Sequence, residues 1–139
     1  ERDIKKLLGA IQTTTDRSIL DRQSFLPAIY HLSALVAQDV GDSKMAESYF
    51  KMALTTDPND AAIYSDFGVY YYEGDKQSSA LEMYEKALKL NPKHYQARLN
   101  RDGILIDKNP TETIKDLREL AENASAPSGI RGDAYATLA

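Results

Sequence analysis

An internal repeat with a period of 34 residues constrains the fold of this chain more than any other feature. When the sequence is shifted by 34 residues, positions 27–60 align with positions 61–94 without a gap. The identical pairs are small, apolar or helix-ending residues, the types that determine packing and turns. They are Ala28/Ala62, Ile29/Ile63, Tyr30/Tyr64, Ala46/Ala80, Ala53/Ala87, Leu54/Leu88 and Pro58/Pro92. A period of this length predicts equivalent units that stack on one another and share one core.

Each unit has the pattern of two helices. In the second unit, apolar and small residues recur at i, i+3, i+4 and i+7 from Tyr64, and at i, i+4, i+7 and i+8 from Ala80. This spacing is typical of one face of a helix. Gly74 separates the two stripes, and Pro92 ends the second helix because proline disfavours helical geometry in the residue before it. The first unit repeats the plan, so the sequence predicts one helix pair in each unit.

The glycines of the repeats have two expected roles. Gly68 lacks a side chain, so two helix backbones can approach closely there, and Tyr84 is expected to fill the space beside them. At the turn between the helices, Gly74 comes one residue earlier in its unit than Gly41 does in the first unit. We therefore expect the first helix of the second unit to end sooner than its counterpart.

Residues 95–125 are predicted to form a degenerate third unit. Leu99 and Leu105 keep an apolar face, but Asp102 stands where the second unit has Gly68. Asn109-Pro110 is typical of a helix start, with asparagine as the cap and proline in the first turn. The third unit is therefore expected to be helical, with a less regular core.

The two ends of the chain are expected to be helical as well. Residues 1–26 are predicted to contain an amphipathic capping helix over Glu1–Gln12, with Lys5 and Lys6 towards water, followed by a polar linker that includes Thr13–Asp16. The apolar stripe of this helix consists of Ile4, Leu7, Leu8 and Ile11. In residues 126–139, a break at Ala126–Gly129 is expected to precede the start of a further helix over Asp133–Ala139.

The repeat resembles a tetratricopeptide repeat, a helix–turn–helix of 34 residues. The second unit carries the resemblance at Tyr64, Phe67, Gly68, Tyr71, Ala80, Tyr84, Ala87 and Pro92. The first unit matches at Tyr30, Gly41, Asp42, Ala46, Phe50, Ala53 and Pro58, and departs at Ser33, Ala34 and Ala37. The resemblance implies an all-α fold, an α-solenoid of stacked antiparallel helix pairs that winds into a right-handed superhelix. It also implies a protein-interaction scaffold or adaptor that binds a peptide or helix in its concave groove.

The groove of such a solenoid would be lined by the stripe beside Tyr64, Gly68 and Tyr71. The candidate partner-binding residues are Ala28, His31, Leu35, Gln38, Ala62, Ser65, Asp66, Val69, Tyr72, Gln96, Leu99 and Asn100, and Gly103 and Ile106 continue the stripe. We favour Tyr72 as a contact, because large amphipathic side chains are enriched in binding hot spots. The alternative for Leu35, Val69 and Ile106 is that they only pack on neighbouring helices.

A subgroup of the family holds the C-terminal carboxylates of chaperones with Lys, Asn and Arg on this face. Only Asn100 fits that pattern here. His31, Ser65 and Leu99 stand where polar or basic groups would be needed. We therefore expect no carboxylate clamp.

The composition gives no sign of catalysis. The chain has no cysteine, and its two histidines, His31 and His94, lack acidic partners at metal-ligand spacing. No motif of a serine nucleophile, a zinc protease or a phosphate-binding loop occurs. The net charge of −4 is opposite to that of a general nucleic-acid binder, and no apolar run approaches the ~20 residues of a membrane span. We expect no enzyme, no cofactor, no metal, no nucleic-acid partner and no membrane insertion.

Alternatives to a general adaptor stay open. The chain is also compatible with a bacterial envelope assembly factor or a secretion escort protein. It is equally compatible with a regulatory arm of a larger enzyme. Self-association into a weak homodimer is a further alternative, because the degenerate third unit leaves apolar surface that another copy could cover.

Overall fold

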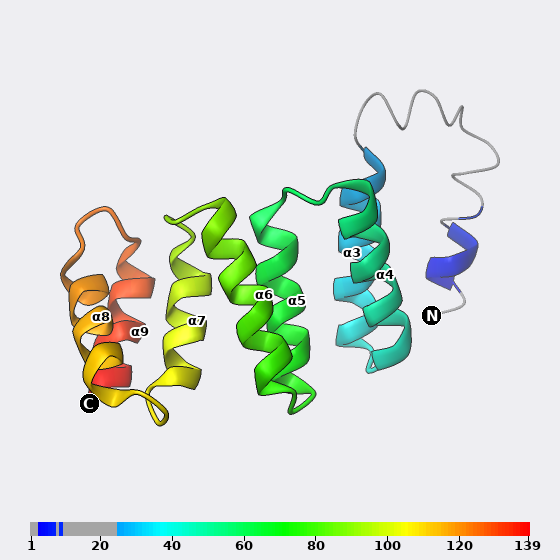
Figure 1. Cartoon of the computed structure of the whole chain (residues 1–139). Coiled ribbons are helices and arrows are strands. Elements are labelled where there is room, and N and C mark those ends of the chain that lie inside the picture. Colours follow the sequence, from blue (N-terminus) through cyan, green and yellow to red (C-terminus); the bar gives the residue numbers. More distant parts are fainter. Residues whose placement is uncertain (1–2, 8, 10–24) are drawn as a thin grey trace. The chain divides into compact units, whose positions relative to one another are not determined.

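The computed structural model describes residues 3–7, 9 and 25–139, and every regular element within these residues is a helix (Figure 1). The predicted all-α class is therefore confirmed. The helices are α3 (Phe25–Asp39), α4 (Ser43–Thr56), α5 (Ala61–Glu73), α6 (Gln77–Leu90), α7 (Tyr95–Leu105), α8 (Pro110–Glu122) and α9 (Ser128–Leu138). The chain divides into two compact units, Glu1–Ile63 and Tyr64–Ala139.

Part of the expected N-terminal helix belongs to the described residues. Residues 3–7 and 9 are helical, and Lys5 and Lys6 are exposed as predicted. Leu7 is also 61% exposed. The remainder of Glu1–Gln12, including Leu8 and Ile11, and the expected linker at Thr13–Asp16 lie outside the described residues.

The compact unit Glu1–Ile63 contains the helix pair α3 and α4. The contact surface between these two helices is made of small residues and aromatic rings. Ala34, Ala37, Ala46 and Ala53 are fully buried there. The small residues let the two backbones lie close together, and aromatic side chains complete the contact. The Tyr30 and Tyr49 rings, one from each helix, stack with their centroids 6.4 Å apart. The sequence departures at Ser33, Ala34 and Ala37 are therefore buried positions of this helix pair.

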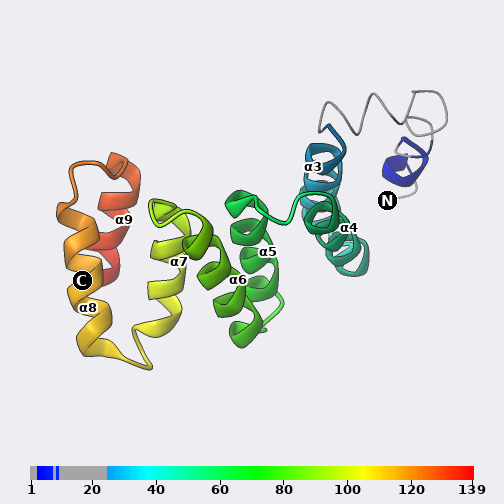
Figure 2. The same cartoon turned by 45° about the horizontal axis from the view of Figure 1, so that its top comes forward.

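In the compact unit Tyr64–Ala139, α6 packs against α7, and α7 packs against both α8 and α9. Figure 2 shows α8 and α9 side by side, beyond α7. The expected close approach occurs between α5 and α6. A Cβ atom added to Gly68 would lie 2.5 Å from Cε1 of Tyr84, and Tyr84 is 2% exposed. The ring of Tyr84 thus occupies the space that a side chain at position 68 would need.

The expectation that α5 ends early is wrong. It ends at Glu73, the position equivalent to the last residue of α3, Asp39. The reason is that Asp75 takes the left-handed conformation (φ 63°) that Gly41 has in the first unit (φ 84°). The same hydrogen bond then closes both turns. The backbone N–H of Lys76 donates to the Tyr71 carbonyl at 2.9 Å, as the equivalent N–H does in the first unit.

The third helix pair, α7 and α8, forms as predicted, with Asn109 at the N-cap position of α8 and Pro110 in its first turn. The side chain of Asn109 makes no capping bond but lies 3.3 Å from a carboxylate oxygen of Glu112. The core of this region joins three helices and the loop between two of them. It contains Leu99, Leu117, Leu120, Ala121, Ala126 and Ala134.

The last helix begins earlier than expected. The prediction placed its start at Asp133, but α9 starts at Ser128, directly after Pro127, and includes Gly129 and Gly132. The physical reason is tertiary packing. Ile130 and Leu138 pack against the core of the third helix pair, and Ala134 belongs to it, so apolar residues at every fourth position hold a helix that its glycines disfavour.

The degenerate position of the third unit, Asp102, is buried in an ion network between α7 and α8. Asp102 is 1% exposed. The Arg101 Nε donates to Asp102 Oδ1 at 3.1 Å, while the Arg101 Nη2 donates to Asp116 Oδ2 at 3.2 Å. Arg98 donates to both carboxylate oxygens of Asp116, at 3.0 and 2.8 Å. Glu119 and Glu85 lie at the edges of this network, 3.5 Å from Arg98 and 3.9 Å from Arg101 respectively.

The two aspartates of this network have pKa values displaced in opposite directions. Burial raises the pKa of Asp102 to about 7, and the nearby Asp116 carboxyl adds to the rise. Hydrogen bonds from Asp102 and Arg98 outweigh burial at Asp116 and lower its pKa to about 2. No donor group hydrogen-bonds Oδ2 of Asp102, and the Asp116 carboxylate lies within hydrogen-bonding reach of the Asp102 side chain, so a proton on Asp102 can be donated to Asp116. Asp102 therefore holds a proton more readily than a surface aspartate does.

Candidate partner-binding site

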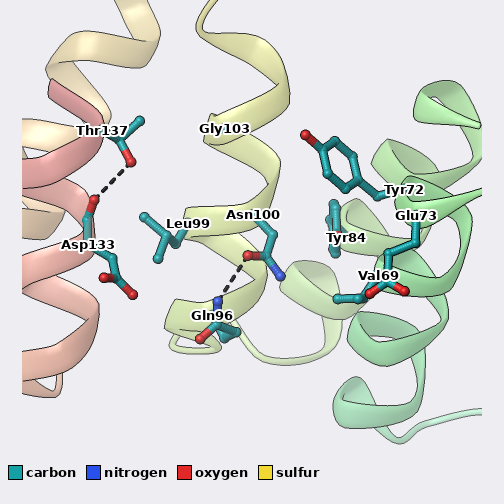
Figure 3. A pocket seen from close by; sticks show the side chains of 10 residues that line it. All are labelled: Val69, Tyr72, Glu73, Tyr84, Gln96, Leu99, Asn100, Gly103, Asp133 and Thr137. Atoms are coloured by element: carbon teal, nitrogen blue, oxygen red, sulfur yellow. Dashed lines mark hydrogen bonds between the residues drawn. The ribbon is translucent and has the colours of Figure 1, made fainter. Parts of the chain in front are cut away.

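A pocket of about 450 Å³ opens on the Tyr64–Ala139 unit. Its lining side chains come from α5, α6, α7 and α9 (Figure 3). They are Val69, Tyr72, Glu73, Tyr84, Gln96, Leu99, Asn100, Gly103, Asp133 and Thr137. This volume lies within the range of small-molecule pockets. We therefore expect the pocket to receive one or two side chains of a partner rather than a whole segment.

The α5 wall consists of Val69, Tyr72 and Glu73. Helical spacing places the first two on the same face, and Glu73 lies next to Tyr72 at the last position of the helix. Tyr72 is 49% exposed. An exposed aromatic ring beside a half-buried valine gives this wall an apolar surface that a partner could cover.

The α7 side of the pocket presents an ordered pair of amides. Gln96 and Asn100 are four residues apart, and the Gln96 Nε2 donates to Asn100 Oδ1 at 2.9 Å. Asn100 also hydrogen-bonds the hydroxyl of Tyr84, which opposes the rise of that pKa. Burial dominates nonetheless and raises the pKa of Tyr84 to about 12, with contributions from neighbouring Tyr72, Glu73 and Asp66. The Tyr84 hydroxyl therefore stays neutral, and the amide of Asn100 is held in one orientation.

The α9 wall supplies Asp133 and Thr137. These residues are one helical turn apart, and the Thr137 hydroxyl donates to the backbone carbonyl of Asp133 at 2.8 Å. The Asp133 side chain is exposed and points towards the pocket in Figure 3. Among the ten lining residues, the charged ones are Asp133 and Glu73, both acidic.

Several predicted groove residues come together in this pocket. They are Val69, Tyr72, Gln96, Leu99 and Asn100. Gly103, which continues the stripe, also lines it. Tyr72, the contact that the sequence favoured, is the most exposed of the large hydrophobic side chains among them. Leu99 is only 8% exposed and belongs to the core of the third helix pair, so it forms the floor of the pocket.

Other predicted residues lie elsewhere. Ser65 is 2% exposed, so its side chain is not available to a partner, contrary to the prediction. Asp66 is half-buried and Ala62 is exposed, and neither lines the pocket. Ile106 packs against the core of the third helix pair, as the alternative interpretation expected.

The remaining predicted residues belong to the first unit, on one face of α3. Ala28 is exposed, Leu35 is 37% exposed, and His31 and Gln38 are half-buried. The His31 ring lies 6.3 Å from the ring of Phe50. His31 is therefore partly engaged in packing between α3 and α4.

The sequence missed Glu73, Tyr84, Asp133 and Thr137 as pocket residues. The sequence predicts that Tyr84 packs between helices, and its ring does pack there while also reaching the pocket. Asp133 and Thr137 are predicted only as part of a further helix. The signal that could have found them is the apolar stripe at every fourth residue from Ile130, because Asp133 and Thr137 lie beside it on α9.

The described residues also bear on two other kinds of site. The described part of the chain holds no group of three or more His, Cys, Asp or Glu side chains placed to bind a metal ion. Its helices also include none with the length and apolar character needed to cross a membrane.

Comparison with known proteins agrees with the repeat architecture. The family model described as "Tetratricopeptide repeat" matches residues 27–60 and 61–94. The chain is 25% identical over 100 residues to "Uncharacterized protein ycf37" of Pyropia yezoensis, across 72% of this chain and 56% of that protein. It superposes on PilF of Pseudomonas aeruginosa with a TM-score of 0.68 and 22% identity, across 83% of this chain and 51% of that one.

The chain thus spans about half the length of the proteins it matches, and the likeness to PilF is one of fold. The repeat boundaries found by the family model are those of the 34-residue period in the sequence. The helix pairs of the structure follow the same boundaries. Residues 27–60 and 61–94 of the chain are tetratricopeptide repeats.

Proposed function

We propose that this chain is a protein-interaction scaffold or adaptor, and that the Tyr72 pocket of the Tyr64–Ala139 unit receives side chains of a partner peptide or helix. Tetratricopeptide repeats support a scaffolding role in general. The observation that carries the finer proposal is the pocket itself. Predicted groove residues from α5 and α7 line it together with residues of α9.

The physical basis is a surface that is already formed. The pocket combines the exposed ring of Tyr72 with the fixed amides of Gln96 and Asn100. A partner that binds there orders little of the scaffold, so little of the interaction free energy is lost to ordering. We also propose that the chain has no catalytic activity of its own and no nucleic-acid partner, and that it is a monomer or a weak dimer.

The test is affinity capture with a matched pair of tyrosine variants. Tyr72→Ala removes an exposed ring from the pocket, and Tyr135→Ala removes one that is 55% exposed on α9 but does not line it. We expect Tyr72→Ala to lose partners retained by the parent, with affinity lowered at least about tenfold, and Tyr135→Ala to keep them. If both variants retain every partner, the pocket is not the binding site.

A third variant, Leu35→Asp, tests the predicted face of α3 in the first unit. Partners lost with this variant but retained with Tyr72→Ala would assign binding to α3 instead.

The alternatives from the sequence concern who the partner is rather than how it is bound. An envelope assembly factor or secretion escort would be separated from a cytosolic adaptor by fractionation of the full-length product. A regulatory arm of a larger enzyme would be recognised by a catalytic domain in the complete coding sequence. In each case Tyr72→Ala and its control Tyr135→Ala test whether the partner binds at the pocket.

A further inference from the structure

We propose that the partner segment received by the Tyr72 pocket is basic, and that it places a lysine or arginine side chain between the acidic walls of the pocket. This inference rests on the proposed function, because it names the chemistry of the segment that the same pocket would hold.

The charge of the lining is the first argument. Glu73 and Asp133 bring carboxylates from two different helices, α5 and α9, and the pocket has no lysine or arginine among its ten lining residues. In Figure 3 these two acids lie on opposite sides of α7. Asp66 adds negative charge nearby, since it is one of the groups that raise the pKa of Tyr84. Such a site attracts cations and disfavours anions.

The neutral lining suits the rest of a basic side chain. Val69 and Leu99 offer apolar surface for the methylene stem of a lysine or arginine. The Tyr72 ring is half exposed, so a cation can lie against its face. The Asn100 oxygen accepts one hydrogen bond from Gln96 and, as a carbonyl oxygen, has capacity for a second donor. Each part of a long cationic side chain thus meets a group that favours it.

The same lining disfavours the ligand that a subgroup of the family binds. A C-terminal carboxylate needs basic groups, and here Glu73 and Asp133 would repel it. The sequence predicts no carboxylate clamp, and the lining of the pocket is acidic. Both features favour partners whose charge is opposite to that of a carboxylate, which means basic partners.

A display library of random heptapeptides, selected on the full chain, tests this inference. We expect the peptides selected in a Tyr72-dependent manner to be enriched in lysine and arginine. The strongest binder is then synthesised with each arginine replaced by citrulline, which removes the charge and nearly keeps the shape, or with each lysine replaced by acetyl-lysine, which removes the charge and lengthens the side chain. Titration by fluorescence polarisation should show at least a tenfold loss of affinity for the neutral peptide.

The protein side of the experiment uses two double variants with the same change in net charge. Glu73→Gln with Asp133→Asn removes the acids of the pocket. Asp107→Asn with Glu122→Gln removes exposed acids of the same unit that do not line it. We expect the first pair to reduce the preference for the charged peptide to less than twofold, and the second pair to preserve it.

The outcomes separate this inference from the proposed function. Peptides that depend on Tyr72 but show no preference for basic residues, or prefer acidic ones, overturn the charge inference alone. An equal preference for the charged peptide in both double variants also overturns it. A library that yields no Tyr72-dependent peptide overturns the inference together with the proposed peptide binding.

Discussion

At Gly68 the packing of α5 on α6 leaves no room for one additional carbon atom. An added Cβ would lie 2.5 Å from Cε1 and 2.8 Å from Cδ1 of Tyr84. Because the Tyr84 ring is buried, it has little room to move away. We expect Gly68→Ala to lower the free energy of unfolding by about 1–3 kcal/mol through overpacking. Urea denaturation followed by far-UV circular dichroism measures this change.

The control for Gly68 is Gly103, a helical glycine whose added Cβ would meet no atom within 4 Å. We expect Gly103→Ala to raise the free energy of unfolding by about 0.5–1 kcal/mol, because alanine favours the helix more than glycine does. Equal effects of the two substitutions would show that the contact with Tyr84 does not control the packing.

Asp102 gives the free energy of unfolding a dependence on pH. The folded protein retains a proton on Asp102 up to about pH 7, whereas the unfolded chain releases it near the ordinary aspartate pKa of 3.8. The contribution of Asp102 is therefore fully present below about pH 4 and is lost as the pH rises through 7. Asp116, whose pKa is lowered to about 2, acts in the opposite direction and only in more acidic solution.

Asp102→Asn tests this account, because an asparagine amide can donate to Asp116 at every pH. We expect the parent to lose stability between pH 4 and pH 8, by at most about 4 kcal/mol at 1.4 kcal/mol per pKa unit. The variant should lose much less over the same range. The measurement is urea denaturation at several pH values, with Asp107→Asn as an exposed control. Parallel curves for parent and Asp102→Asn would contradict the raised pKa.

At the scale of the element, the N-terminal caps distinguish the second helices of the two matched repeats. Asp42 caps α4 by accepting a hydrogen bond from the backbone N–H of Met45 at 3.0 Å. The equivalent residue before α6 is Lys76, which makes no side-chain capping bond. A lysine at this end also opposes the helix dipole. The second repeat thus lacks a stabilising contact that the first repeat has.

Lys76→Asp should supply that contact and raise the free energy of unfolding by about 1 kcal/mol. Lys76→Ala is the control, since it removes the positive charge without adding an acceptor. Thermal unfolding compares the two variants with the parent. If aspartate and alanine stabilise the protein equally, the gain comes from charge removal and the cap contributes nothing.

At the scale of the whole molecule, the distribution of charge predicts the response to nucleic acid. The net charge is −4, and the two matched repeats carry −3 and −1. No segment of the sequence combines enough lysine and arginine to release the counterions of a phosphate backbone. We expect titration with labelled RNA at physiological salt to show only weak, non-specific association. A dissociation constant in the nanomolar range would contradict this prediction.

The 34-residue period and the apolar stripes determined which segments form helices and how they pair, because both depend on neighbours close in sequence. The place of Gly68 was predicted for the same reason, since its partner Tyr84 lies in the same repeat. The sequence misplaced the end of α5 and the start of α9. Both depend on conformations that the local residue types disfavour and that packing or backbone hydrogen bonds support.

Only the tertiary structure decided which face of each helix stays accessible. Periodicity groups Ser65 with Tyr72 on one stripe, but burial separates them, because a stripe is a property of one helix and exposure depends on its neighbours. The contribution of Asp133 to the pocket and the raised pKa of Asp102 have the same origin. Each requires groups from different helices to meet, and that meeting is fixed by how helix pairs pack rather than by residue spacing along the chain.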